Sequence, residues 1–223
     1  MKVYAVKSGR MPGIYQTWAE CREQVQGFSG AVFKAFEDEA SAEAYLAQEQ
    51  ELPIRDDLPF AYIDGTFSQK AGCYGWGGFI NDGQHCHILQ GKGNIPEYLP
   101  ERNIAGELIG ALQVPFTCQK LGIREINLYC DYAGIENYVN GNWKARTPLA
   151  IYYASTMDLL MDDTEIHFIH VDGHTGIEGN ELADILAKDA IGAKLRKKDI
   201  AAIEAFRNSI GNQQEEGEHR DDH

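Results

Sequence analysis

The sequence predicts an α/β fold in which helices flank a mixed five-stranded sheet, with a small α+β domain ahead of it. The first observation is that three strand patterns joined by glycine-rich turns open the segment 59–195. The second is that helix and strand patterns alternate through the rest of that segment. Such an order predicts a sheet with helices packed on it in layers. Residues 1–48 have their own strands and helices and are predicted to form a separate domain.

The small domain is predicted to contain strand, strand, helix, strand and helix in that order. Its strands are expected in KVYAVKSG, IYQTW and AVFKAF, which lie between turn residues. Thr17 and Glu20 fit a capping box, which indicates a helix start. The acidic first turn of DEASAEAYLAQEQ indicates the second helix. Residues 49–58 contain Pro53 and several charges and are predicted to be a linker.

The larger domain, 59–195, contains five strand segments and four helix segments. The strands are expected in FAYID, YGWGGFI, HCHILQGKG, INLYCD and EIHFIHV. The helices are expected in ERNIAGELIGALQVPFTCQKLG, YAGIENYVNG, TPLAIYYASTMDLLM and GNELADILAKDAIGAKL. Residues 196–223 are predicted to be a C-terminal helix and an acidic tail, with the polar segment 211–223 disordered.

The composition is that of a globular protein, with 43% hydrophobic and 24% charged residues. We expect no membrane partner, because no stretch approaches the roughly 20 apolar residues of a membrane span. The N-terminus lacks the apolar run of a signal peptide. Five cysteines are scattered without a CxxC pair, which argues against a disulfide framework and favours a cytoplasmic location. No obligate protein partner is indicated.

The net charge of −14 argues at first against nucleic acid as a partner, because phosphate binding needs cations. The charge is unevenly distributed, however. Residues 1–36 carry five Lys or Arg and two Glu, and they form the most basic block of the chain. Phosphate contacts are therefore expected first in the small domain.

Four acidic residues interrupt the apolar patterns of the larger domain. Asp64 and Asp131 end predicted strands, while Glu107 and Asp184 lie among the apolar positions of predicted helices. A buried carboxylate is costly unless it is compensated, and Mg²⁺ ions provide such compensation. Two of these ions about 4 Å apart can activate a water and stabilise the leaving oxygen in phosphodiester hydrolysis. Each acid taken alone also fits a turn residue or an exposed helix position.

Around these acids the chain resembles type 1 ribonuclease H. The segments YIDGT, NIAGEL, LYCD and GHTGIEGNELAD resemble the four family motifs, in the family's order and spacing, over residues 60–192. The resemblance implies a ribonuclease H-like fold. It also implies an endonuclease that hydrolyses the RNA strand of RNA/DNA hybrids and leaves 3′-hydroxyl and 5′-phosphate ends.

The same resemblance implies roles for individual residues. It assigns catalysis and the binding of two Mg²⁺ ions, with Mn²⁺ as a substitute, to Asp64, Glu107, Asp131 and Asp184. His174 would assist proton transfer or product release. The implied substrate-binding residues of this domain are Gly65, Thr66, Asn103 and Asn180.

A second resemblance covers the N-terminus, which is similar to the hybrid-binding (viroplasmin-like) domain found ahead of some ribonucleases H. The family grips the duplex with aromatic and basic residues, and the matching positions are Tyr4, Trp18, Phe33 and Lys34. Basic groups can contact phosphates, and aromatic rings can pack on bases. Strand alternation requires some of the aromatic residues on these strands to be core residues instead.

The chain departs from both family patterns. Ala35 stands where a second basic residue often follows, which predicts weaker duplex affinity. Lys70 stands where many relatives carry a substrate-contacting Asn, and Tyr132 stands where a small polar residue is usual. The basic handle found in many relatives is reduced to two cations, in GNWKARTPLA. We expect the small domain to substitute for this handle, so that deletion of residues 1–52 raises KM far more than it lowers kcat.

Two other functions fit parts of the sequence. One is a catalytically inactive hybrid-binding protein on the same fold, and the other is a DNA nuclease of related fold. The presence of all four acids and His174 weighs against the first, and GHTGIEGN with the small domain weighs against the second. A metal site shared by His167 and His170 is disfavoured, because residues three apart on a strand face opposite sides.

Overall fold

The computed structural model describes residues 2–28, 31–47, 57–171 and 178–218. The chain divides into two compact units. The first consists of residues 1–56 with Glu136–Lys144, and the second of residues 57–135 with 145–223.

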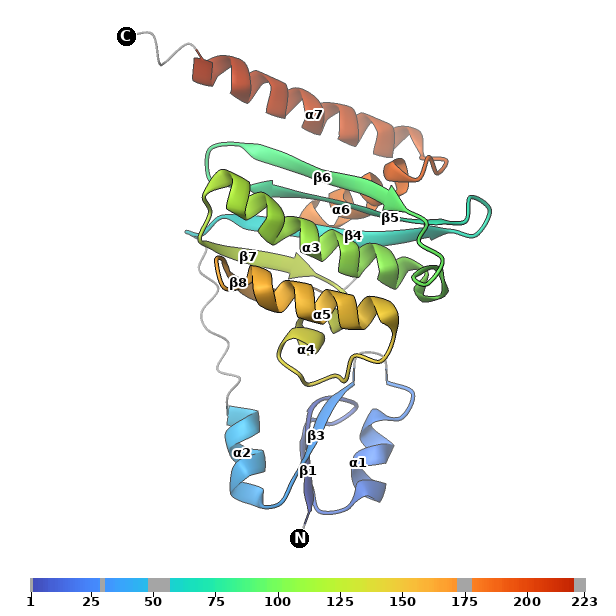
Figure 1. The fold of residues 1–223 in the computed structure, drawn as a ribbon, viewed down its shortest axis with the longest axis vertical. Helices are drawn as coiled ribbons and strands as arrows, with labels where there is room; N and C mark the ends of the chain where they lie inside the picture. The colour runs from blue at the N-terminus through green and yellow to red at the C-terminus, as the bar shows by residue number, and fades with distance from the viewer. Residues whose placement is uncertain (1, 29–30, 48–56, 172–177, 219–223) are drawn as a thin grey trace. The chain divides into compact units, whose positions relative to one another are not determined.

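The N-terminal unit contains a three-stranded antiparallel sheet in the order β2-β1-β3 (Figure 1). Its elements are β1 (Val3–Ser8), β2 (Gly13–Tyr15), α1 (Trp18–Val25), β3 (Val32–Phe36) and α2 (Glu39–Ala47). The predicted capping box is confirmed: the Glu20 amide donates to the Thr17 hydroxyl, and the Thr17 amide donates to the Glu20 carboxylate. The helix therefore begins where the sequence predicts.

The small sheet has a core on each face. On one face, Val6 packs with Cys21 and Val25 of α1. On the other face, Ala5 packs with Ala42 and Tyr45 of α2. Because side chains alternate along a strand, neighbouring residues of β1 and β3 serve opposite faces of the domain.

The larger unit is built on a mixed five-stranded sheet, as the sequence predicts, with the strand order β6-β5-β4-β7-β8. The strands are β4 (Phe60–Ser68), β5 (Cys73–Asn81), β6 (Cys86–Gly93), β7 (Glu125–Cys130) and β8 (Glu165–His170). The first three form an antiparallel meander, whereas β7 pairs parallel with both β4 and β8. The carboxyl ends of β4, β7 and β8 therefore lie at the same end of the sheet.

Helices lie on both faces of this sheet (Figure 1). The helices of this unit are the short 3₁₀ helix η1 (Leu99–Glu101), α3 (Asn103–Leu121), α5 (Pro148–Leu160), α6 (Glu178–Ala190) and α7 (Lys197–Glu218). The short helix α4 (Gly134–Val139) begins in this unit, and its residues from Glu136 on belong to the first unit. Helix α3 packs on the face that carries Ile63 and Gly65, and α6 packs on the opposite face, against Tyr62 and Gly77. Helix α7 lies on the α6 side, where the ring of Phe206 contacts that of Phe79 edge to face.

The prediction of disorder for 211–223 is wrong for its first part, because α7 runs to Glu218. Ile203 is buried and Phe206 packs on the sheet, so the start of the helix is fixed by tertiary contacts. Extending an existing helix costs far less than starting one, which accounts for helical structure in a polar sequence. Residues 219–223 lie outside the described part. None of the described helices is long and apolar enough to cross a membrane.

Candidate active site

Two of the four predicted carboxylates lie at the same end of the sheet because of strand register. Strand β4 carries Asp64, and Asp131 directly follows β7. The two strands run parallel with Tyr62 opposite Tyr129. Two residues further along each strand, the register therefore brings Asp64 and Asp131 together on the α6 face of the sheet.

The third carboxylate, Glu107, is brought in by a close approach of α3 to β4 that only glycine allows. A Cβ atom on Gly65 would lie 2.3 Å from the Glu107 backbone nitrogen and 2.4 Å from the Asn103 carbonyl oxygen. On the helix side, a Cβ on Gly106 would lie 2.0 Å from the Gly75 carbonyl oxygen. The two glycines let the backbones touch, and Glu107 then reaches the end of the sheet beside Asp64.

Asp64, Glu107 and Asp131 form one cluster. Each offers a carboxylate oxygen, and these three oxygens lie within 4.8 Å of one another. Glu107 is 3% exposed and Asp64 is 8% exposed, so water screens neither charge well. In a metal-free protein such a cluster carries strong mutual repulsion.

The pKa values of the cluster reflect first its burial and then this repulsion. Burial, together with the negative charges of Asp131 and Asp184, raises the pKa of Asp64 to about 6. Burial also raises the pKa of Glu107 well above its ordinary value, with the charge of Asp64 adding to the effect. A hydrogen bond between the two side chains lowers the pKa of Asp64 and raises that of Glu107.

The residues present fit a divalent cation. The Oε2 atom of Glu107 is buried without a hydrogen-bond partner, although a buried oxygen of this kind normally has one. A cation would satisfy this oxygen and relieve the repulsion that shifts the pKa values of Asp64 and Glu107. The cluster is therefore a carboxylate site suited to metal binding.

Asp184 lies on α6 near this cluster but is engaged differently. Its charge acts on Asp64, whereas its carboxylate accepts a hydrogen bond from the Lys188 ammonium at 2.5 Å. Residues four apart lie on the same side of a helix, which accounts for this pair. Lys188 is not among the residues predicted from the sequence, although its i, i+4 spacing from Asp184 is a visible signal for this pair.

Three of the remaining predicted residues of this domain lie on α6, α3 and β4. Asn180 is 6% exposed, and its Oδ1 atom has no hydrogen-bond partner. Asn103 is exposed at the first residue of α3, and Thr66 is half-buried on β4. His174 lies in 172–177, outside the described residues.

Three of the predicted duplex-binding residues of the small domain form an aromatic cluster. The ring of Trp18 lies 5.6 Å from that of Tyr4 and 5.5 Å from that of Phe33, measured between centroids. Trp18 is 44% exposed and Phe33 37% exposed, so neighbouring rings present one apolar surface to solvent. We call Tyr4, Trp18 and Phe33 the aromatic trio.

Lys34 lies on the other face of the small sheet, since it follows Phe33 on β3. Its ammonium is 5.7 Å from the ring centroid of Tyr45, a residue of α2. Lys7 also places its ammonium over the Tyr45 ring, at 4.4 Å. The structure thus brings the aromatic trio together and places Lys34 on the α2 face.

Comparison with known proteins gives two family matches. The profile of the RNase H family matches residues 59–192, and that of the ribonuclease H1 N-terminal domain matches residues 2–46. The first match covers more than half of the chain. The chain belongs to the ribonuclease H family. It is therefore a nuclease, a hydrolase of phosphodiester bonds, and its family is metal-dependent.

Individual relatives agree with this placement. The chain is 28% identical to ribonuclease H1 of Homo sapiens over 86% of its own length and 89% of that protein. It is 31% identical to ribonuclease H of Chromohalobacter salexigens over 58% of this chain and 81% of that one. Among solved structures, LC11-RNase H1 isolated from compost has a TM-score of 0.50 at 20% identity, covering 60% of this chain and 96% of that one. This last likeness shows the fold.

Arg102, beside the ribonuclease H site, has a strained backbone for which the sequence gives no signal. Arg102 has a φ of 55°, the one positive value among described residues other than glycine. Its guanidinium carbon lies 5.5 Å from the ring centroid of Phe67 on β4. The strain is located directly before Asn103, at the start of the helix that carries Glu107.

Proposed function

We propose that this ribonuclease H cleaves the RNA strand of RNA/DNA hybrids and leaves 3′-hydroxyl and 5′-phosphate ends. The observation that carries the proposal is the cluster of Asp64, Glu107 and Asp131, in which a buried oxygen of Glu107 has no partner. A ribose 2′-hydroxyl distinguishes the cleaved strand from DNA, and the shape of the minor groove distinguishes a hybrid from other duplexes.

The proposed cofactor is a pair of Mg²⁺ ions, with Mn²⁺ able to replace them. Asp64, Glu107, Asp131 and Asp184 would hold the ions. When bound, the ions supply charge for the scissile phosphate, an activated water and stabilisation of the leaving oxygen. Lys188 contacts only Oδ2 of Asp184, so Oδ1 could serve as the metal ligand while this bond is kept.

The chain's own residues prepare the site and position the substrate. The raised pKa values of Asp64 and Glu107 favour their protonated forms without metal, and a cation that compensates their charges would favour release of these protons. Asn103, Asn180 and the segment Gly65–Thr66 are proposed to contact the substrate. His174 is proposed to take part in proton transfer or product release.

The small domain is proposed to bind the same hybrid through the aromatic trio. Flat exposed rings pack on bases or sugars without regard to sequence, which suits an enzyme that must act on many hybrids. The basic block 1–36 supplies cations for phosphate contacts. We also propose the domain division predicted from the sequence: 1–48, 49–58, 59–195 and 196–223.

The test compares three end-labelled substrates: RNA/DNA hybrid, duplex RNA and duplex DNA, each in Mg²⁺. We expect the wild-type protein to cut only the RNA strand of the hybrid, and Asp131→Asn to abolish cutting. Activity should also disappear in EDTA and return with Mg²⁺.

The same assay tests the alternative of an inactive hybrid-binding protein. If the wild-type protein binds the hybrid but cuts nothing in Mg²⁺ or Mn²⁺, the nuclease proposal fails. If DNA duplex is cut at the same rate as the hybrid, the substrate proposal fails and the nuclease chemistry stands.

A substitution in the aromatic trio is expected to affect substrate binding rather than chemistry. Trp18→Ala should raise KM for the hybrid roughly tenfold, because loss of one stacking contact costs about 1–3 kcal/mol, with kcat nearly unchanged. Phe28→Ala is the matched control, since Phe28 is an exposed aromatic residue of the same domain at 38% exposure. Steady-state kinetics of both variants would decide, and equal KM values for the two would contradict the assignment.

The cytoplasmic location remains a proposal. It is supported by the five cysteines, all of which are free thiols. Such thiols suit a reducing compartment.

A further inference from the structure

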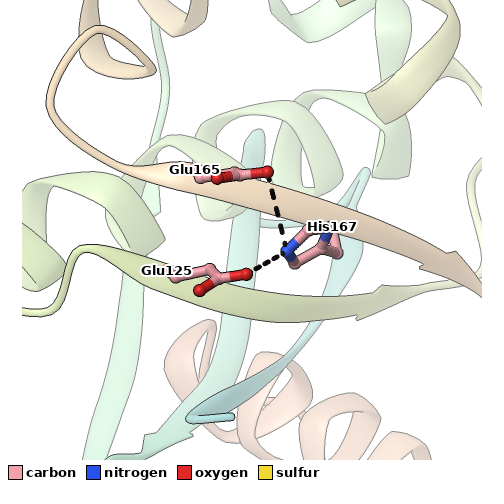
Figure 2. A group of neighbouring side chains, drawn as sticks. All are labelled: Glu125, Glu165 and His167. Carbon is pink, nitrogen blue, oxygen red and sulfur yellow. Dashed lines mark hydrogen bonds and ion pairs between the residues drawn. The ribbon is translucent and has the colours of Figure 1, made fainter. Parts of the chain in front are cut away.

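A second group of metal-ligating side chains lies at the opposite end of β7 and β8 from the carboxylate cluster. It consists of Glu125, Glu165 and His167 (Figure 2). The Nε2 atom of His167 is 2.9 Å from Oε1 of Glu125 and 4.0 Å from Oε1 of Glu165. Glu125 begins β7 and Asp131 follows it, so the two groups are roughly 20 Å apart at 3.3 Å per residue.

Strand register fixes the position of all three side chains. Glu125 and Glu165 are direct partners on parallel strands, and His167 lies two residues further along β8 on the same face. Like charges placed opposite each other on neighbouring strands repel. Here the imidazole lies between the two carboxylates (Figure 2).

The distances suit a transition metal. A tetrahedral Zn²⁺ with bonds of roughly 2.0–2.2 Å holds its ligand atoms roughly 3.3 Å apart. The two measured separations from Nε2, 2.9 and 4.0 Å, lie on either side of this value. Small side-chain rotations would therefore be enough to place one ion among the three atoms.

The donor set also distinguishes this group from the carboxylate cluster. An imidazole nitrogen with two carboxylates favours Zn²⁺ or a similar transition metal, whereas oxygen donors alone favour Mg²⁺. The side chains of His167 and Glu125 are 22% and 31% exposed, and that of Glu165 is 69% exposed. The group is thus partly enclosed by the sheet and open to solvent on the Glu165 side.

We propose that Glu125, Glu165 and His167 form a binding site for one Zn²⁺-type transition metal ion, separate from the catalytic cluster. Water would complete its coordination. The ion would cross-link the edge strand β8 to its neighbour β7. Its effect would be on the stability of the sheet rather than on the chemical step.

The experiment is a calorimetric titration of the full chain with Zn²⁺ in excess Mg²⁺, so that Mg²⁺ occupies the carboxylate cluster. We expect Glu165→Gln and His167→Gln each to weaken one zinc site at least tenfold. They should also remove the rise in Tm that Zn²⁺ gives the wild-type protein. Because Glu165 is mostly exposed, Glu165→Gln should fold normally and keep its cleavage of hybrid in Mg²⁺.

His170→Gln is the matched control, because His170 lies on β8 but faces the other side. It should keep both the zinc site and the Tm rise. His87→Gln tests whether Zn²⁺ binds instead at the other described histidine that pairs with a carboxylate, since Nε2 of His87 lies 2.8 Å from Oδ2 of Asp82. The proposal is overturned if Glu165→Gln binds Zn²⁺ as the wild type does, or if His87→Gln alone removes the site. Either result leaves the nuclease assignment untouched, because that is measured in Mg²⁺ alone.

Discussion

Asp64→Asn is expected to lower kcat for hybrid cleavage at least about a thousandfold. Asp64 lies in the cluster where the proposed ions are held, and a neutral amide cannot replace a carboxylate as a ligand. Metal-ion stabilisation of a transition state amounts to several kcal/mol, which corresponds to this factor. Single-turnover kinetics in Mg²⁺ would measure the effect. Asp158→Asn, an exposed aspartate on α5, is the control and should retain full activity.

The same substitution is expected to stabilise the protein when metal is absent. The pKa of Asp64 is raised to about 6 from an ordinary value of 3.8, mainly by burial. The contribution of protonated Asp64 to the free energy of unfolding is therefore complete below about pH 4 and is lost as the pH rises through 6. A shift of this size corresponds to about 3 kcal/mol. Asp64→Asn should recover up to that amount at pH 8 and little at pH 4.

Urea denaturation in EDTA at the two pH values tests this expectation. Asp158→Asn should give wild-type stability at both. In saturating Mg²⁺ at pH 8, the wild-type protein should instead be more stable than Asp64→Asn, because the wild-type cluster gains stability from the ion and the variant does not. A metal-free Asp64→Asn that is less stable than wild type at pH 8 would contradict a raised pKa of Asp64 in the folded protein.

The sequence predicts much of the site because strand ends and helix starts have local signals. Asp64 and Asp131 each end an apolar run that predicts a strand, and this places both of them at a strand end. The capping box of Thr17 and Glu20 predicts the start of the helix that follows Thr17. Alternation along β3 likewise implies that Phe33 and Lys34 face opposite sides. These features depend on neighbours in the chain.

Features that depend on distant parts of the chain were not predictable. The meeting of Glu125 with Glu165 and His167 requires the register of β7 against β8, which alternation alone does not set. The raised pKa of Glu107 depends on how closely α3 packs against β4, because burial is its main cause. The polar composition of 211–218 does not indicate a helix. This part of α7 is helical because upstream residues such as Phe206 fix the start of the helix by tertiary contacts.

Gly65→Ala is expected to disrupt the site from the backbone. The new Cβ would lie 2.3 Å from the Glu107 nitrogen and 2.4 Å from the Asn103 oxygen, and both are backbone atoms that cannot rotate away. Strand β4 and helix α3 must then separate, at a cost of about 1–3 kcal/mol in stability. Because this separation moves Asp64 away from Glu107, kcat should fall by about a hundredfold.

Gly110→Ala is the control for this effect, since Gly110 packs on the same strand but meets side-chain atoms of Ile63 and Trp76. It should lose comparable stability while keeping most of its activity below its Tm. The comparison separates a loss of folding from a loss of carboxylate geometry. If both variants lose stability but Gly65→Ala retains wild-type kcat, the close approach of α3 to β4 does not position the catalytic cluster.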